Sequence, residues 1–413
     1  MSAFGERRVV ITGSGTVSAL GNDWAAVGER LRAMRSAVRY MPEWEVYPEL
    51  KARIAAPIDD FQLPGHYRAR ERRALGRVAQ MAVVATEDAL QQAGLGGDPV
   101  ITGGRTGVAY GSATGSSAAG MEFLSLLRDH SMEQVNTTTY TRMMSHTAAV
   151  NIGVKFGTRG RVYTTSSACT AGSQGVGYAY EAIKAGVQDV MIAGGAEELC
   201  PTQSAVFDVI LAASRHHNDS PECSPRPFDR DRDGLALGEG ATTLILEELE
   251  HARARGATVL AEVIGYATNA DGAHLVRPQQ ATQETVIRLC LEDAGIDPRE
   301  VGYVSAHATA TANGDIAESH ATANVLGAVP VSALKSYTGH SLGACAAFEL
   351  WASIMMMNEG WFAPTLNLDN VDPQCAELDY IRGECRAIET DVIMSNNFAF
   401  GGINTSLLVR RWS

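Results

Sequence analysis

A cysteine stands where a short apolar run meets a helix-length stretch of small residues, in the segment Val162-Tyr-Thr-Thr-Ser-Ser-Ala-Cys169-Thr-Ala-Gly. The unpaired N–H groups and positive end of a helix favour thiolate over thiol, so we expect the pKa of Cys169 to lie below its ordinary value of about 8.5. The small neighbours leave room for a bulky substrate to reach the sulfur. A cysteine between strand and helix is more often a small core residue, so its interpretation depends on its partners.

Two later segments supply such partners. Val304-Ser-Ala-His307 and Ala333-Leu-Lys335-Ser-Tyr-Thr-Gly-His340 each follow a short apolar run. Each histidine is therefore expected at the end of a strand, where open α/β sheets carry their catalytic groups. Together with Glu318, these residues describe a thiol nucleophile served by paired hydrogen-bond donors.

The elements that must position these residues are indicated by hydrophobic patterning. Short apolar runs predict buried strands at 8–13, 106–110, 189–193, 242–246, 259–264, 301–305 and 392–395. Stretches with helical apolar spacing lie between several of them, at 74–93, 172–185, 283–294 and 344–359. This alternation predicts an α/β fold with largely buried sheets.

A change of pattern marks the middle of the chain. The polar, Pro-punctuated residues 214–234 are predicted to form a long surface loop, and a helical segment at 251–256 follows it. We place the boundary between two halves there, giving domains 1–250, with the cysteine, and 251–413, with the two histidines and the lysine.

Composition narrows the class of protein. The 413 residues include 34 Lys and Arg against 47 Asp and Glu, and the net charge of −13 disfavours binding to nucleic acid or to an anionic membrane. The seven cysteines are odd in number and form no CxxC pair, which argues against a disulfide framework or a zinc module. No leader or membrane span is recognisable, so we expect a soluble cytoplasmic protein.

One alternative is an NADP-dependent dehydrogenase of the short-chain type. Gly13-Ser-Gly15 follows the first apolar run, and Tyr180 and Lys184 have the Tyr-x-x-x-Lys spacing of those enzymes, with Ser167 upstream. However, a pyrophosphate cradle needs a further glycine where Val17 stands. We therefore keep this function only as a remote alternative.

A second motif suggests a metal but is incomplete. Asp229, Asp231, Asp233 and Gly234 begin like a calcium-binding loop, but its twelfth position is Gly240, so the bidentate carboxylate is missing. We predict a structural turn and no metal site there.

Over essentially its whole length the sequence resembles the β-ketoacyl-acyl-carrier-protein synthases of the thiolase-like superfamily, and it is most similar to their synthase I/II branch. The motifs that carry the resemblance are SSACTAG (166–172), AGGAEELC (193–200), FDRDRDGLALGEGA (228–241), LKSYTGHSLGA (334–344) and MSNNFAFGGINTSLLV (394–409). The resemblance implies a thiolase-like fold of two pseudo-symmetric βαβαβαββ halves, stacked in five layers as α-β-α-β-α.

The resemblance also implies an acyltransferase that extends an acyl chain carried on a phosphopantetheine arm. Cys169 would hold the acyl chain as a thioester. His307 and His340 would hydrogen-bond the malonyl thioester carbonyl and so stabilise the enolate left by loss of carbon dioxide. The enolate would attack the acyl group, with the N–H groups of Cys169 and Phe400 as the oxyanion hole and Phe400 as the gate between half-reactions.

Supporting roles follow from the same resemblance. Lys335 and Glu318 would form a buried ion pair that orients the histidines, and Asp315 would support that network. The substrate-binding positions that it implies are Thr114, Thr309, Thr311, Asp315 and Phe398. No metal and no dissociable cofactor are expected, because loss of carbon dioxide drives the reaction.

Two departures from the family pattern stand near the expected site. His307-Ala308-Thr309 replaces His-Gly-Thr, and Phe398-Ala399-Phe400 replaces Phe-Gly-Phe. Each adds a methyl group where backbone freedom was expected, which bears on gate mobility and on the placement of His307. Thr114 matches a position that helps to set the depth of the acyl pocket in the family. In these three features the sequence resembles ketosynthases of aryl-polyene clusters, which act beside a chain-length-factor partner.

The expected partners are an acyl carrier protein and a second subunit, in a homodimer or in a heterodimer with a chain-length-factor-like paralogue. Carrier proteins are acidic, so a net charge of −13 would repel them and a basic landing site is needed. Arg68, Arg70, Arg72 and Arg73 lie close together, and Arg70 and Arg73 match the family's carrier-docking positions.

Overall fold

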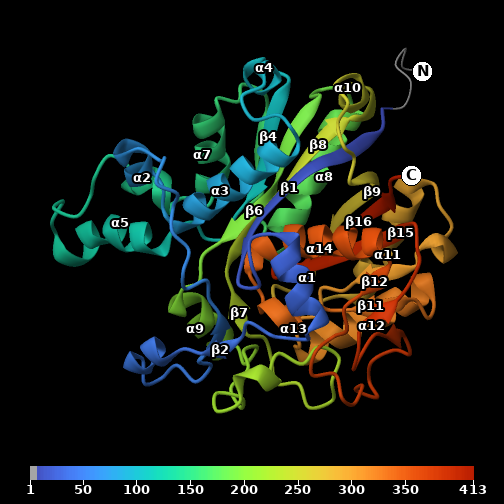
Figure 1. Ribbon diagram of the computed structural model, residues 1–413. Coiled ribbons are helices and arrows are strands. Elements are labelled where there is room, and N and C mark those ends of the chain that lie inside the picture. Colours follow the sequence, from blue (N-terminus) through green and yellow to red (C-terminus); the bar gives the residue numbers. More distant parts are fainter. Residues whose placement is uncertain (1–6) are drawn as a thin grey trace.

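Eleven strands are hydrogen-bonded into one continuous sheet in the computed structural model, which describes residues 7–413 (Figure 1). From edge to edge the order is β13 (Asp379–Tyr380), β11 (Pro330–Ser332), β10 (Tyr303–Ser305), β15 (Val392–Ala399), β16 (Ile403–Arg411), β9 (Ala261–Ala270), β1 (Val9–Ser18), β8 (Gly240–Glu248), β6 (Val190–Glu197), β4 (Thr106–Gly111) and β5 (Val162–Thr164).

The same strand pattern occurs twice in this sheet. In an N-terminal set, β1, β8, β6, β4 and β5 follow one another with two antiparallel pairings and then two parallel ones. In a C-terminal set, β9, β16, β15, β10 and β11 repeat that series. The sets meet at the antiparallel pair of β1 and β9, where Val9 lies opposite Val263. The pseudo-symmetric pair expected from the resemblance is therefore confirmed.

Helices form three layers around the two strand sets. The central layer consists of α8 (Ala171–Lys184) and α14 (Cys345–Glu359), which pack on each other and on strands of both sets. The outer face of the N-terminal set is covered by α3 (Arg77–Gln92) and α7 (Thr147–Phe156). The outer face of the C-terminal set is covered by α11 (Gln280–Ala294), with α12 (Ala312–Leu326) beside it. These layers give the predicted α-β-α-β-α order.

Shorter elements connect the layers. The remaining helices are α1 (Trp24–Arg32), α2 (Ala69–Ala74), α4 (Pro99–Thr102), α5 (Ser117–Asp129), α6 (Thr139–Met143), α9 (Pro201–Val209), α10 (Leu249–Ala254) and α13 (Lys335–Thr338). Two small sheets consist of β2 (Arg39–Tyr40), β3 (Ile54–Ala56) and β7 (Leu237–Gly238), and of β12 (Trp361–Phe362) and β14 (Arg386–Ala387). Among residues 7–413, no helix has the length and apolar character needed to cross a lipid bilayer.

The central helix α14 is buried on nearly every side, which explains its composition. A helix that is apolar all round belongs in a core, and here it lies between two layers of strands. Glu349 interrupts the apolar sequence and is only 1% exposed. A carboxylate in that position requires a partner inside the core.

Gly13 and Gly15 lie within β1, and packing accounts for them without a nucleotide. A Cβ atom at Gly13 would lie 2.3 Å from Ala89 O, and one at Gly15 would lie 2.1 Å from Ala85 O. The two glycines therefore allow α3 to pack directly on the strand. The strand also continues to Ser18 instead of ending at residue 13.

Residues 214–234 are irregular, as predicted, but the expectation of a surface loop is wrong. Phe228 and Asp229 are fully buried. Asp229 Oδ2 accepts hydrogen bonds from the N–H groups of Asp369, at 2.9 Å, and Asn370, at 2.8 Å. This carboxylate of the calcium-like motif therefore fastens one chain segment to another.

Candidate active site

Cys169 lies in a 3-10 turn, η2 (Ala168–Thr170), between β5 and α8. The turn begins at Ala168, whose φ of 54° lies in the left-handed region that few residues with a side chain adopt. An equivalent turn, η5 (Leu342–Ala344), opens α14 and begins at Leu342 with φ of 45°. Its middle residue is Gly343, so the thiol stands in one of two equivalent turns.

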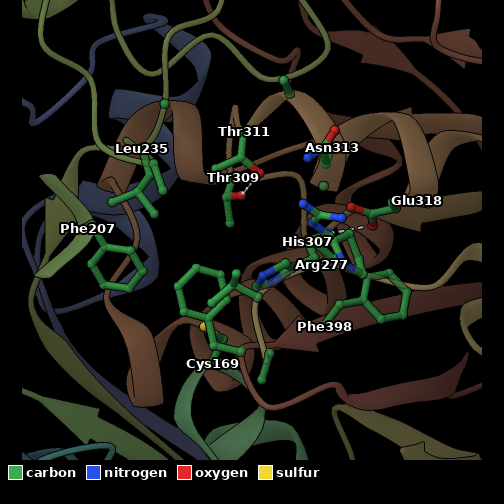
Figure 2. Close-up of a pocket in the computed structure, with 18 of the residues that line it drawn as sticks. Cys169, Phe207, Leu235, Arg277, His307, Thr309, Thr311, Asn313, Glu318 and Phe398 are labelled. Atoms are coloured by element: carbon green, nitrogen blue, oxygen red, sulfur yellow. Dashed lines mark hydrogen bonds between the residues drawn. The ribbon is translucent and has the colours of Figure 1, made fainter. Parts of the chain in front are cut away.

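The two histidines converge on this thiol from the C-terminal set. His340 Nε2 lies 2.9 Å from Cys169 Sγ. The ring centroids of His307 and His340 are 5.3 Å apart and the rings are nearly perpendicular, at 86°. One ligand-type atom from each of the three side chains lies within 4.8 Å of the others, and all three side chains are buried. Figure 2 shows Cys169 and His307 facing the same cavity.

The expectation of a lowered thiol pKa is wrong. Burial raises the pKa of Cys169 to about 11. The positive charge of Lys335 and the backbone N–H groups of Phe400 and Cys169 act in the opposite direction but do not outweigh the loss of solvent. The sulfur is therefore a thiol at neutral pH and must lose its proton as it attacks.

Those two N–H groups also define where an oxyanion can be held. Donors from Cys169 and Phe400 converge on the sulfur, which is the arrangement that stabilises negative charge on an atom bound there. The ring of Phe400 packs against Phe207, with centroids 5.3 Å apart, and lines the cavity. Phe398, on β15, lines it as well.

The two additional methyl groups fit without backbone strain. Ala308 is buried and its N–H donates to Glu318 Oε2 at 2.7 Å, while Ala399 ends β15. Neither residue is among those of positive φ in the described chain. Left-handed geometry begins at Gly401, with φ of 90°, and Gly402, with φ of 71°, so the unusual backbone next to Phe400 falls on glycines.

The predicted ion pair between Lys335 and Glu318 is wrong. Lys335 Nζ lies 2.6 Å from Glu349 Oε1, and both side chains are 1% exposed. Glu349 Oε2 accepts a further hydrogen bond from Asn397 Nδ2 at 3.0 Å. Sequence reasoning missed Glu349 because one acidic residue in an apolar helix forms no motif. The available signal was that a carboxylate in such a helix needs a cation.

Glu318 instead holds the backbone on which His307 stands. Its two oxygens accept the N–H groups of His307 and Ala308, each at 2.7 Å. Burial raises the pKa of Glu318 to about 8. Glu318 is therefore a positioning residue for His307.

Asp315 lies behind the cavity wall, outside the residues that line the cavity. It is fully buried, and its Oδ2 accepts the N–H of Phe228 at 2.8 Å and lies 3.5 Å from Arg232 Nε. Arg232 in turn donates to the carbonyl of Ala312 at 3.0 Å. Asp315 therefore supports the wall that carries the start of α12 and is not among the residues that line the cavity.

Both histidines of the site are neutral near pH 7. Burial, together with the positive charge of Lys335, lowers the pKa of His307 and of His340 well below its usual value. A neutral imidazole carries one N–H and one lone pair, so each ring can donate to a carbonyl or accept a proton.

The three side chains open onto a cavity of about 450 Å³. Thr309 and Thr311 line it, with their hydroxyl oxygens 3.0 Å apart. Thr114 does not line it. It is exposed, and its Oγ1 donates to the buried carboxylate of Glu197 at 3.0 Å. The expected contact between Thr114 and the cavity is therefore absent from the described chain.

The loop at 271–278 was missed by sequence reasoning and forms one side of the cavity mouth. Its Leu275 and Arg277 line the cavity, and Arg277 is visible there in Figure 2. Two backbone hydrogen bonds tie it to the glycines that follow Phe400: Gly401 N–H donates to Leu275 O at 2.8 Å, and Asp271 N–H donates to Gly402 O at 2.7 Å. The loop therefore contacts the segment that follows Phe400 directly.

The residues of the dehydrogenase alternative lie outside the cavity. Tyr180 Oη donates to Asp293 Oδ2 at 3.0 Å, and Lys184 Nζ donates to Asp293 Oδ1 at 2.8 Å. These hydrogen bonds fasten α8 to α11.

The expected docking arginines are on the surface. Arg70 and Arg73 are exposed on α2, and neither forms an ion pair among residues 7–413. Their guanidinium groups are therefore available to an acidic partner.

Two family models together match most of the chain. The model described as "Beta-ketoacyl synthase, N-terminal domain" matches residues 6–252, and "Beta-ketoacyl synthase, C-terminal domain" matches residues 260–369. A curated relative, 3-oxoacyl-[acyl-carrier-protein] synthase 1 of Haemophilus influenzae, is 33% identical over 98% of this chain and 100% of its own length.

Two solved structures are similar over nearly the whole chain. A β-ketoacyl synthase from Burkholderia phymatum STM815 has a TM-score of 0.97 and 52% identity, covering 98% of this chain and 100% of its own. The ishigamide ketosynthase/chain length factor has a TM-score of 0.89 and 31% identity, covering 99% of this chain and 100% of its own.

Proposed function

This chain belongs to the β-ketoacyl synthase family, and from that premise we propose that it is a 3-oxoacyl-acyl-carrier-protein synthase. The observation that carries the proposal is the approach of His340 Nε2 to within 2.9 Å of Cys169 Sγ, with His307 facing both across one buried cavity. A thiol nucleophile with two neutral imidazoles is suited to thioester exchange followed by carbon–carbon bond formation.

In the first half-reaction, Cys169 Sγ attacks the carbonyl carbon of an acyl thioester on the carrier's phosphopantetheine. Because burial raises the pKa of the thiol to about 11, its proton leaves as the carbon–sulfur bond forms. His340 Nε2 is within reach to accept that proton and to return it to the departing carrier sulfur. The N–H groups of Cys169 and Phe400 stabilise the tetrahedral oxyanion.

In the second half-reaction, malonyl thioester occupies the cavity beside the acyl-Cys169. The carboxylate departs as carbon dioxide, and the electron pair of the broken carbon–carbon bond becomes an enolate. The N–H of His307 stabilises the enolate oxygen, and so does that of His340 in the tautomer whose proton lies on Nε2. The enolate carbon attacks the acyl carbonyl, and collapse of the intermediate expels the Cys169 thiolate and gives 3-oxoacyl carrier. The thiolate takes up a proton from solvent, which restores the resting thiol. No metal and no dissociable cofactor are required, since loss of carbon dioxide makes the reaction favourable.

Acyl carrier protein is the partner that delivers both substrates in this proposal. Arg70 and Arg73 form its docking site, because they are exposed cations on a chain whose net charge is −13. The hydroxyls of Thr309 and Thr311 would bind the pantetheine arm as it enters the cavity.

The enzyme acts as a dimer in this proposal. β5 ends the sheet and leaves a free edge, where Val162 is 47% exposed. On α5, Met121 is 56% exposed and Leu127 73% exposed, which is unusual unless an apolar partner covers them. A second copy of the chain would cover both features, and Thr114 would then lie near the partner subunit.

A heterodimer with a chain-length-factor-like paralogue is the second candidate for the partner. It is favoured by similarity to the ishigamide ketosynthase/chain length factor, at 31% identity. Under this alternative the protein acts in polyene or polyketide-type elongation, including the aryl-polyene subtype, and under the first it acts in fatty-acid synthesis. Mass measurement of the purified chain in solution, alone and co-expressed with such a paralogue, distinguishes the two assemblies. The cytoplasm is the expected compartment for either.

The proposed activity is tested by intact-protein mass spectrometry. Incubation with acyl carrier protein bearing an acyl chain is expected to add one acyl mass to the wild-type chain and none to Cys169→Ala. Addition of malonyl carrier protein is then expected to remove the acyl mass and form 3-oxoacyl carrier. His307→Ala should accept the acyl group but fail at this second step. Acylation that persists in Cys169→Ala would refute the mechanism.

A further inference from the structure

We propose that the active site is also an inhibitory binding site for a thiophilic divalent cation such as Zn²⁺, held by Cys169, His307 and His340. One ligand-type atom of each residue lies within 4.8 Å of the other two, and all three side chains are buried. This property is separate from condensation, and it makes no use of the ion in the reaction.

The spacing suits a four-coordinate zinc ion. Zn–S and Zn–N bonds of about 2.3 and 2.0–2.1 Å place the ligand atoms of a tetrahedral site about 3.3–3.6 Å apart. In the metal-free arrangement His340 Nε2 and Cys169 Sγ are 2.9 Å apart, and no pair of the three atoms exceeds 4.8 Å. Changes of about 1.5 Å or less in the separations therefore bring the three donors to bonding distance, and the set of one thiolate and two imidazoles is a zinc-preferring one.

The surroundings can support His307 as a ligand, whereas His340 Nδ1 has no hydrogen-bond partner among residues 7–413. A metal-bound histidine usually donates its other ring N–H to an acceptor. The amide nitrogen of Asn397 lies 3.5 Å from His307 Nδ1, and Asn397 Oδ1 has no hydrogen-bond partner among residues 7–413. Rotation of that amide would present an oxygen to Nδ1–H in exchange for the hydrogen bond that Asn397 Nδ2 donates to Glu349 Oε2.

Charge and space also permit the ion. The nearby ammonium of Lys335 is paired with Glu349 at 2.6 Å, so part of its charge is already compensated. The cavity of about 450 Å³ in front of the sulfur can hold a water molecule as the fourth ligand. Binding exchanges the thiol proton, released to buffer, for a sulfur–metal bond.

The consequence is a block at one defined step. A metal-bound sulfur cannot attack a thioester, so the ion prevents acyl transfer to Cys169. Once the sulfur carries an acyl group it can no longer act as a thiolate ligand, and the site loses its strongest donor. The acyl-enzyme should therefore be resistant to the ion.

Spectroscopic titration with Co²⁺, followed by displacement with Zn²⁺, tests binding without any activity measurement. Wild-type protein is expected to show a thiolate-to-cobalt charge-transfer band that saturates at one Co²⁺ per chain. Cys169→Ser should abolish the band, and His307→Asn and His340→Asn should each weaken affinity at least tenfold. The double variant His216→Asn, His217→Asn removes the other histidine pair near a carboxylate, beside Asp233, and should leave the band unchanged. A band that survives Cys169→Ser, or that the double variant removes, would overturn the proposal.

A second measurement compares the free enzyme with protein acylated beforehand. Zn²⁺ is expected to suppress acylation of the free thiol at least tenfold, and acylated protein should bind Co²⁺ at least tenfold more weakly than free protein. Equal affinity for both forms would contradict the assignment. Because the Co²⁺ titrations on free protein need no substrate, the metal site stands or falls separately from the condensation activity.

Discussion

Lys335 Nζ lies 2.6 Å from Glu349 Oε1 in the core between the two strand sets, and neither side chain is more than 1% exposed. The pair joins α13 to the central helix α14, and His340 follows closely after α13. Removal of either charge would leave the other buried and uncompensated.

Glu349→Ala is therefore expected to destabilise the protein by about 3–5 kcal/mol, as measured by urea unfolding, because it strands the Lys335 ammonium. The double variant Lys335→Met, Glu349→Leu removes both charges and should recover most of that stability. It should not recover condensation, since the charge that influences His307 and His340 is gone. If the double variant were as unstable as Glu349→Ala, the unpaired Lys335 charge would not be the cause of the lost stability.

Alkylation of Cys169 should report its raised pKa. Because burial raises the pKa of the thiol to about 11, the thiolate fraction grows about tenfold per pH unit below that value. The rate of reaction with iodoacetamide, followed on the Cys169 peptide, is expected to increase between about pH 7 and pH 10 without levelling. Unfolded protein serves as the control, and its alkylation rate should level off near the ordinary pKa of a thiol. A plateau below pH 8 in the folded protein would contradict the assignment.

Stability should fall as the pH rises from weakly acid to weakly alkaline values. Burial raises the pKa of Glu318 from 4.5 to about 8, so the folded state holds a proton that the unfolded state has lost between those values. Each group shifted in this way lowers the free energy of unfolding by about 1.4 kcal/mol per pH unit in that range. Glu197, whose pKa burial raises to about 7, adds to the slope. In Glu318→Gln, the free energy of unfolding should fall less steeply with pH, by the equivalent of about one proton. An unchanged pH dependence would refute the raised pKa of Glu318.

Charge reversal at Arg70 and Arg73 should affect only carrier-bound substrate. The variant Arg70→Glu, Arg73→Glu is expected to raise the apparent KM for malonyl carrier protein at least about fivefold, because attraction to the acidic carrier becomes repulsion. The KM for malonyl-pantetheine, which carries no protein, should not change. Arg35→Glu alters another exposed arginine and is the matched control. Equal effects on both substrates would refute docking at α2.

Gly15→Ala should disrupt the packing of α3 on β1. The new Cβ would lie 2.1 Å from Ala85 O, a contact that backbone must move to relieve. We expect a loss of at least about 1–3 kcal/mol in thermal or urea unfolding. Gly65→Ala is the matched control, because no atom lies within 4 Å of its added Cβ. Equal stability of the two variants would contradict the packing explanation for the glycine motif.

Local hydrophobic patterning predicted the bounds of those helices and strands whose length depends on their own sequence. The helix expected at 172–185 is α8, observed at Ala171–Lys184, and the strand expected at 106–110 is β4 with one further residue. Patterning fell short where distant pairing decides the length. β9 was expected to end at residue 264 but continues to Ala270, because it pairs with β16 along that whole stretch.

The chemistry of the site depends on packing that local sequence does not describe. The N–H groups near Cys169 do favour the thiolate, as predicted, but desolvation by the surrounding layers is larger and reverses the net direction of the pKa shift. Likewise, Glu318 and Glu349 are both buried acids near Lys335, and only the three-dimensional arrangement shows that Glu349 is the ion-pair partner.

The pairing of β1 with β9 gives the protein a duplicated framework that contains a single reaction centre. The turns that open α8 and α14 are equivalent, but one carries Cys169 and the other Gly343, while both histidines come from the C-terminal set. In the proposed mechanism neither repeat can work alone, because one lacks the two histidines and the other lacks the nucleophile. If the chain were divided in the connection near α10, activity would depend on reassembly of the two fragments. The activity of the divided chain would therefore report whether the two repeats recognise each other.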